Sequence, residues 1–191
     1  MREQAKIDGI TESVIFRETA KLHGLTTDCT DFELFAQALA EEHVKRATEL
    51  RERGHALPGA AAVLDALDAD SVQQTVVSGN VRPVAEIKLQ VFGLDQHILW
   101  ELGAYGEDHD TRAALVRLSL QGAEATAAQT VLIGDTPADV QGAHANGVRV
   151  IAVASGRSDK AALRDAGAEV VLPDLRETAL LVKLVRGMSG S

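Results

Sequence analysis

Residues 131–139 read VLIGDTPAD, an apolar run that ends in two carboxylates on either side of a proline. Three consecutive apolar side chains are typical of a strand that is buried on both faces. Pro137 suits the first turn of a helix, so a helix is expected to begin there. The stretch therefore predicts a buried strand ending at Asp135 and a helix that carries Asp139 in its first turn.

The same alternation of strands and helices continues on both sides of this stretch. Predicted strands cover residues 75–77, 99–104, 148–153 and 170–172, and predicted helices cover residues 58–67, 82–92, 110–121, 137–146 and 158–166. Such alternation indicates an α/β fold, a Rossmann-like parallel sheet with helices on both faces. We assign residues 56–191 to this core domain.

Residues 1–55 show helical periodicity and no strand pattern. Ile10, Val14 and Leu22 recur at helical spacing. A second helix is expected to begin near Asp31, which can cap it, and to run to Leu50. The N-terminal part is therefore predicted to be a separate helical module.

Ser78, Gly79 and Asn80 follow the predicted strand 75–77 and precede a predicted helix. In α/β sheets ligands bind beyond the carboxyl ends of the strands. A hydroxyl and exposed amides before a helix N-terminus suit an oxyanion such as phosphate. The alternative is that these residues form only a turn and a helix cap.

Asp135 and Asp139 are candidate ligands for Mg²⁺, because carboxylates at the end of a strand form a hard oxygen site. Alternatively, Asp135 only caps the helix and Asp139 only complements its dipole. Arg112, at the start of the helix before this strand, is a candidate cation for phosphate charge. Taken alone, it could instead be a solvated surface arginine, and Lys88, in the middle of a predicted helix, is a rival for the same role.

These three elements, in this order, resemble the haloacid dehalogenase superfamily, closest to its phosphoglycolate-phosphatase-like branch. The resemblance covers nearly the whole chain. Ser78 matches the family's strand-end Ser/Thr, which hydrogen-bonds the transferred phosphoryl group. Residues 134–139 match its Gly-Asp-(Ser/Thr)-x-x-Asp motif, in which the first aspartate holds Mg²⁺ and the second supports it. Arg112 stands where the family usually has lysine, and it keeps the charge but not the point-like geometry.

The resemblance also gives the N-terminal module a role. Residues 1–55 look like the family's helical cap domain, and Gly9-Ile10-Thr11-Glu12 resembles a cap motif that faces substrate, which implicates Thr11 and Glu12. The implied activity is that of a Mg²⁺-dependent phosphatase of a small phosphorylated metabolite.

The family's nucleophile lies in an Asp-x-Asp-Gly-(Thr/Val) motif after a central first strand, and this sequence lacks both. In the nearest stretch, Lys6-Ile7-Asp8-Gly9-Ile10-Thr11, lysine stands in place of the nucleophile. Either the sequence begins inside a longer enzyme, or it is a degenerate family member. The site is then expected to bind without catalysing. The alternative function is a non-catalytic binding or interaction protein on the same scaffold.

The composition narrows the range of partners. The formal net charge is −9, which argues against nucleic acid and against anionic membranes, since both require a cationic surface. The sequence contains no long apolar run and no signal-peptide pattern, so we expect a cytoplasmic protein. The sequence does not indicate the oligomeric state.

Overall fold

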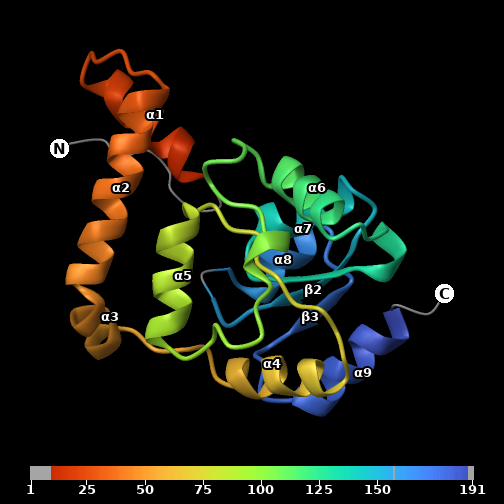
Figure 1. The fold of residues 1–191 in the computed structure, drawn as a ribbon. Helices are drawn as coiled ribbons and strands as arrows, with labels where there is room; N and C mark the ends of the chain where they lie inside the picture. The colour runs from red at the N-terminus through yellow and green to blue at the C-terminus, as the bar shows by residue number, and fades with distance from the viewer. Residues whose placement is uncertain (1–9, 157, 189–191) are drawn as a thin grey trace.

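The computed structural model describes residues 10–156 and 158–188, with the side chain of residue 188 left aside (Figure 1). Its centre is a three-stranded parallel sheet in the order β1-β2-β3. The strands are β1, Val131–Gly134, β2, Arg149–Val153, and β3, Val170–Leu172. Ile151 of β2 pairs with Ile133 on one side and Val170 on the other.

Helices cover both faces of this sheet, which confirms the predicted α/β architecture (Figure 1). Val150 and Ala152 of β2 pack toward α6, α7 and α8, whereas Ile151 packs toward α4 and α9. This division follows from the strand period of two, which sends successive side chains to opposite faces. The helices are α4, Ala60–Ala69, α6, Arg112–Gly122, α7, Pro137–His144, α8, Lys160–Asp165, and α9, Thr178–Met188.

The last helix, α9, was not among the elements predicted from the sequence. Its residues Leu181 and Val185 are buried against α4 and β2. They are four positions apart and therefore lie on one helical face. A pattern of this kind was present in the sequence, so the helix was predictable.

Two segments, 74–80 and 98–106, are called here the bridged segments. They are joined by isolated parallel bridges, Gln74 with Ile98 and Val77 with Ala104, and not by a continuous ladder. Residues 75–77 and 99–104 therefore do not form the continuous strands that were predicted. The second is interrupted by a 3₁₀ turn, Trp100–Leu102, whose backbone oxygens accept hydrogen bonds from the hydroxyls of Tyr105 and Ser119.

Within the part of the chain that the structure describes, β1 pairs with β2 alone. Its other edge therefore has no ladder partner there, and Ile133 on this strand is 37% exposed. An isoleucine is normally buried when its strand has neighbouring strands along both edges and helices over both faces of the sheet. The exposure of Ile133 is therefore unusual for an interior strand.

The N-terminal residues form three helices, α1, Glu12–Leu22, α2, Cys29–Lys45, and α3, Ala47–Arg53. The second predicted helix thus begins earlier and divides near residue 46. Asp28 is its N-cap and forms a capping box with Asp31, so the cap predicted at Asp31 is wrong. Stacked and tilted rings of Phe16, Phe32 and Phe35 join α1 to α2.

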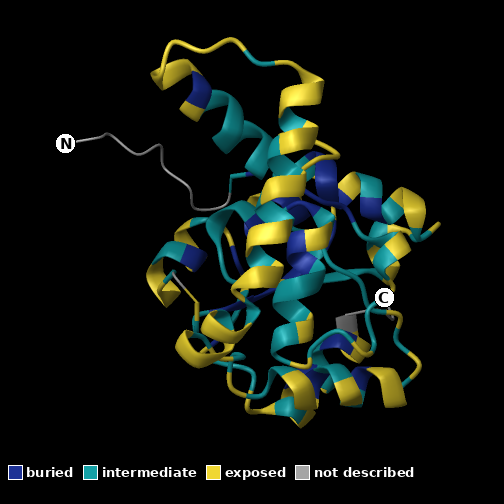
Figure 2. Ribbon diagram, turned by 60° about the vertical axis from the view of Figure 1, so that its left-hand side comes forward, coloured by how far each residue is buried: buried dark blue, intermediate teal, exposed yellow. Residues whose placement is uncertain are grey.

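These three helices lie to one side of the sheet, with α2 beside α5, Arg82–Val91 (Figure 1). Figure 2 shows buried residues gathered around the sheet, whereas the N-terminal helices are mostly exposed or half-buried. A short 3₁₀ turn, Ala127–Gln129, precedes β1. In the described part of the chain, no helix has the length and apolar character needed to cross a membrane.

Candidate functional site

The loop after β1 locks Asp139 into place. The backbone N–H and the hydroxyl of Thr136 donate to Asp139 Oδ2 at 3.1 and 2.7 Å, and the N–H of Asp139 donates back to the Thr136 hydroxyl at 3.3 Å. A Cβ on Gly134 would lie 2.6 Å from Asp139 Cβ. Gly134 therefore leaves the space that this carboxylate needs, and Asp139 is only 8% exposed.

Arg112, at the first position of α6, joins two separate parts of the fold. Its Nε lies 3.1 Å from Asp139 Oδ1. Its Nη1 donates to the backbone oxygen of Val77 at 2.8 Å. Gly142 of α7 makes room for this side chain, because a Cβ there would lie 2.7 Å from Arg112 Cγ. The Arg112 guanidinium thus holds Val77, in the first bridged segment, beside the loop after β1.

Asp135 lies half-buried at the end of β1 and against the loop after β2. A Cβ on Gly156 would lie 1.7 Å from Asp135 Oδ2, so only glycine is compatible with this arrangement. Both oxygens of Asp139 already contact Thr136 or Arg112. Asp135 is therefore the carboxylate of the pair that is better placed to receive a ligand.

The donor set for Mg²⁺ is small. No cluster of three or more potential ligands occurs among residues 10–156 and 158–188. Mg²⁺ is commonly held by one or two carboxylates together with water and the oxygens of a bound phosphate. Asp135 fits such a site as one ligand, and phosphate would have to supply others.

Ser78, Gly79 and Asn80 form a tightly held loop between the first bridged segment and α5. Gly79 accepts a backbone hydrogen bond from Glu12, and Asn80 accepts one from Gly106, both at 2.8 Å. Gly106 must be glycine, since a Cβ would lie 2.0 Å from the Gly79 oxygen. The loop is therefore clamped by the start of α1 on one side and by the second bridged segment on the other.

Carboxylates satisfy the first backbone amides of α5. Val81 N–H donates to Glu12 Oε2 at 2.6 Å, and Arg82 N–H donates to both Glu107 oxygens at 2.9 and 3.1 Å. Burial raises the pKa of Glu12 and of Glu107 above the ordinary value for glutamate. The amides of Val81 and Arg82 are therefore already used, and phosphate contacts would have to come from the Ser78 end of the loop.

Thr11 and Glu12 contact the core, and neither faces open solvent. Thr11 is 2% exposed, and its hydroxyl donates to the backbone oxygen of Asp110 at 3.3 Å. Arg17 of α1 forms two hydrogen bonds with the Asp110 carboxylate, at 3.2 and 2.6 Å. The hydrogen bond with Arg17 lowers the pKa of Asp110. The start of α1 is thus fixed to residues 105–110, whereas Lys6 to Gly9 lie outside the described residues.

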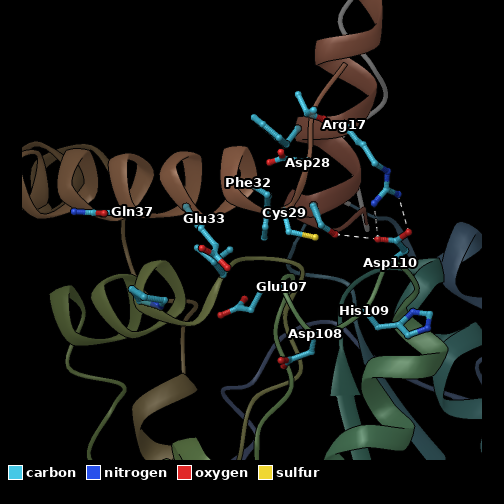
Figure 3. A pocket seen from close by; sticks show the side chains of 16 residues that line it. Arg17, Asp28, Cys29, Phe32, Glu33, Gln37, Glu107, Asp108, His109 and Asp110 are labelled. Atoms are coloured by element: carbon cyan, nitrogen blue, oxygen red, sulfur yellow. Dashed lines mark hydrogen bonds and ion pairs between the residues drawn. The ribbon is translucent and has the colours of Figure 1, made fainter. Parts of the chain in front are cut away.

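A cavity of about 860 Å³ separates α1 and α2 from residues 107–110 (Figure 3). Phe16 and Phe32 line it from the helices, and Val81 and Pro83 line it from the start of α5. Figure 3 shows Glu107, Asp108 and Asp110 along its lower side and Arg17 above Asp110. Because Val81 follows Asn80 directly, the cavity begins next to the Ser78–Asn80 loop.

The arrangement brings several predicted residues together and adds others. Arg112 connects the residue before Ser78 with Asp139, four residues after Asp135. Lys88, considered as a rival to Arg112, instead reaches Asn80. Asp110 and Glu107 were not predicted, and no local pattern identifies them, because their partners, Arg17 and the backbone amide of Arg82, lie 93 and 25 positions away.

Comparisons with known proteins fit this geometry. The family model for haloacid dehalogenase-like hydrolases matches residues 9–144, and the HAD-hydrolase-like model matches residues 111–178. Among curated protein sequences, none matches this chain.

Solved structures share the fold at low sequence identity. A hydrolase from Pseudomonas syringae superposes with a TM-score of 0.68 at 21% identity, covering 93% of this chain and 80% of its own. A HAD family hydrolase from Deinococcus radiodurans, with bound phosphate and sodium, has a TM-score of 0.61 at 20% identity, with coverage of 95% and 78%. A predicted phosphoglycolate phosphatase from Haemophilus somnus has a TM-score of 0.60 at 17% identity, with coverage of 92% and 79%.

Proposed function

This chain belongs to the haloacid dehalogenase-like hydrolase family, and we propose that its site binds the phosphoryl group of a small phosphorylated metabolite. The observation that carries the proposal is the position of Arg112. Its guanidinium joins Val77, the residue before Ser78, to the acidic loop after β1. This link supports the proposal that the Ser78 hydroxyl, the Arg112 cation and the carboxylates of the loop act together on one phosphoryl group.

Each residue has a distinct proposed role. The hydroxyl of Ser78 donates a hydrogen bond to a phosphoryl oxygen, and the Arg112 cation offsets phosphate charge. Asp135 binds Mg²⁺ directly, and Asp139 supports the site by holding Thr136 and Arg112. When bound, Mg²⁺ would supply positive charge beside the phosphoryl oxygens. Its binding should depend strongly on phosphate, because Asp135 alone is a sparse donor set.

The rest of the substrate is proposed to enter the cavity between the N-terminal helices and residues 107–110. We propose that residues 1–55 act as a cap domain over the core of residues 56–191. The support is that α1 is fixed to the core by the Arg17–Asp110 pair, while α2 and residues 107–110 line opposite sides of the same cavity.

We propose further that this chain binds phosphate without turning substrate over. The sequence contains no Asp-x-Asp-Gly segment, and the family's covalent step requires an aspartate at that place. Metal-dependent hydrolysis of p-nitrophenyl phosphate, lost on Asp135→Asn, would contradict this part of the proposal. Loss on Asp8→Asn would show that Asp8 takes part.

The binding proposal is tested by titrating inorganic phosphate into the protein with and without Mg²⁺, by calorimetry. Ser78→Ala should weaken phosphate binding about tenfold or more, because a hydrogen bond to a charged group contributes about 1.5–3 kcal/mol. Asp135→Asn should remove the enhancement by Mg²⁺. Exposed Asp165 and Thr48 provide matched controls, Asp165→Asn and Thr48→Ala, which should leave binding unchanged.

Two results would favour the other candidate function, a binding or interaction protein on a degenerate scaffold. One is the absence of phosphate binding at millimolar concentration. The other is binding that the Ser78 and Asp135 substitutions do not affect.

A further inference from the structure

Lys88 lies on α5, away from any strand end, but its side chain returns to the Ser78–Asn80 loop. Its Nζ donates to Asn80 Oδ1 at 2.6 Å. Side chains on a helix point toward the helix N-terminus, which explains how a residue in the second turn of α5 reaches the loop before it. Lys88 also interacts electrostatically with Glu12.

This contact decides which way the Asn80 amide faces. An ammonium group has three donors and no acceptor, so only the oxygen of the amide can face Lys88. The NH₂ group of Asn80 must then point in the other direction, toward Ser78. Asn80 Nδ2 indeed lies 3.0 Å from Ser78 Oγ as a donor.

The orientation of Asn80 in turn fixes the role of the Ser78 hydroxyl. Ser78 Oγ accepts from Asn80 Nδ2 at 3.0 Å and from the Asn80 backbone N–H at 3.1 Å. A hydroxyl has two acceptor sites and one donor hydrogen. With both acceptor sites occupied, the hydroxyl can offer a further group only its hydrogen. The neighbouring carbonyls of Gly79 and Asn80 already accept backbone hydrogen bonds.

We propose that Lys88 is a positioning residue that acts through Asn80 to present Ser78 as a hydrogen-bond donor to phosphoryl oxygens. This inference rests on the proposed function of the site. It adds that the Ser78 hydroxyl selects an acceptor-only group, such as a phosphoryl oxygen, over ligands that would donate to it. Lys88 thus influences phosphate binding without contacting phosphate.

The test is a double-mutant cycle on the binding of inorganic phosphate. Lys88→Met keeps the length of the side chain but removes the ammonium. It should weaken phosphate binding about tenfold, the range of one lost hydrogen bond. In a Ser78→Ala background, Lys88→Met should have no further effect, because Lys88 acts only through that hydroxyl. Lys88→Arg, which can still donate to Asn80, should restore most of the binding.

A second measurement does not require phosphate. The side-chain NH₂ resonances of Asn80, followed by NMR in protein without ligand, should shift in Lys88→Met and in Ser78→Ala and be nearly unchanged in Lys88→Arg. Asn146, whose NH₂ donates to Ala113 and Gly142, serves as an internal reference.

Two outcomes would overturn the inference. One is a Lys88→Met effect on phosphate binding that persists in full in the Ser78→Ala background, which would mean that Lys88 contacts phosphate directly. The other is an Asn80 spectrum that does not respond to Lys88→Met. If wild-type protein does not bind phosphate at all, the proposed function fails, and the Asn80 spectrum still decides whether Lys88 sets the orientation of Asn80.

Discussion

The sheet of strands β1–β3 and the bridged segments 74–80 and 98–106 contain similar apolar sequence but are held together differently. β2 is paired on both edges, and Ile151 is fully buried between helical layers. Residues 75–77, TVV, resemble residues 131–133, VLI, yet they form only isolated bridges. Thr75 and Tyr105 donate hydrogen bonds within the bridged segments, and Ser119 and Arg112 of α6 donate hydrogen bonds to them from outside.

The difference shows that apolar composition alone does not make a ladder. β1 and β3 each form a ladder with β2, whereas among the described residues the first bridged segment meets residues 98–104 only at two isolated bridges. Stability in the sheet should therefore depend mainly on packing, and stability in the bridged segments mainly on hydrogen bonds.

The largest effect is expected from truncating the best-packed residue of the sheet. Ile151→Ala should lower the free energy of unfolding by about 2–5 kcal/mol, because it removes buried methyl groups and leaves a cavity. That is a large share of the roughly 5–15 kcal/mol typical of folded domains. Urea unfolding followed by circular dichroism measures it, with the slope of the transition checked for two-state behaviour.

Ile133→Ala on the neighbouring strand is the matched control, since Ile133 pairs with Ile151 in register but is 37% exposed. It should cost clearly less than Ile151→Ala. If the two substitutions lower the free energy of unfolding equally, a further segment covers Ile133 in solution. Both edges of β1 would then be covered.

A somewhat smaller effect is expected from Arg112→Met, which removes the link between the two regions. Val77 loses the donor to its backbone oxygen, and Asp139 loses its cation. The expected cost is about 1–3 kcal/mol, the penalty for leaving a buried polar group without its partner. The Ser78 amide donates a hydrogen bond to the backbone oxygen of Ala104. Hydrogen exchange should show reduced protection at this amide before protection of the β2 amides is reduced.

Arg112→Lys sharpens this prediction. Lysine keeps the charge but lacks the forked donors that contact two groups at once. It should therefore recover part of the stability. If Arg112→Met destabilises the protein while protection of the Ser78 amide stays unchanged, Arg112 does not join the two regions.

The order of helices and the three strands of the sheet could be predicted from the sequence because each is encoded locally. Apolar runs bounded by Gly147 or Gly167 fix their own limits. The segment 99–104 could not be predicted, because its 3₁₀ turn depends on hydroxyls of Tyr105 and Ser119 that meet it only in the folded chain.

The candidate site also contains residues whose geometry is encoded locally and residues whose partners are brought to them only by the fold. Gly134 and Thr136 act on Asp139 within a few residues, so the motif predicts its own geometry. Asp110 and Lys88 act through partners that the fold supplies. Arg17 is 93 positions from Asp110, and the reach of Lys88 to Asn80 depends on how α5 follows its loop. Sequence spacing does not contain this information.

The smallest effect is expected from pH, and it should act on the polar contacts around the bridged segments. Burial raises the pKa of Glu12 above 4.5, so its contribution to stability is full below that pH and is lost as pH rises through the folded-state pKa. Glu12→Gln resembles the protonated form and can still accept from Val81. Its melting temperature relative to wild type should therefore increase between pH 4 and pH 7.

Asp110→Asn should show the opposite sign, which makes it the control for Glu12→Gln. The hydrogen bond with Arg17 lowers the pKa of Asp110 below 3.8, so its contribution is present above that pH and is lost as pH falls through the folded-state pKa. Asp110→Asn should therefore destabilise at pH 7 and approach wild type in acid. Both side chains of this pair are more than 40% exposed, so the cost at pH 7 should stay below about 1 kcal/mol and shrink with added salt. Melting curves for both variants at pH 2, pH 4 and pH 7 separate the two signs, because the contribution of Asp110 is lost only as pH falls below 3.8. Parallel behaviour of the two variants would mean that contacts elsewhere, and not those of α1 with residues 78–81 and 105–110, control the response to pH.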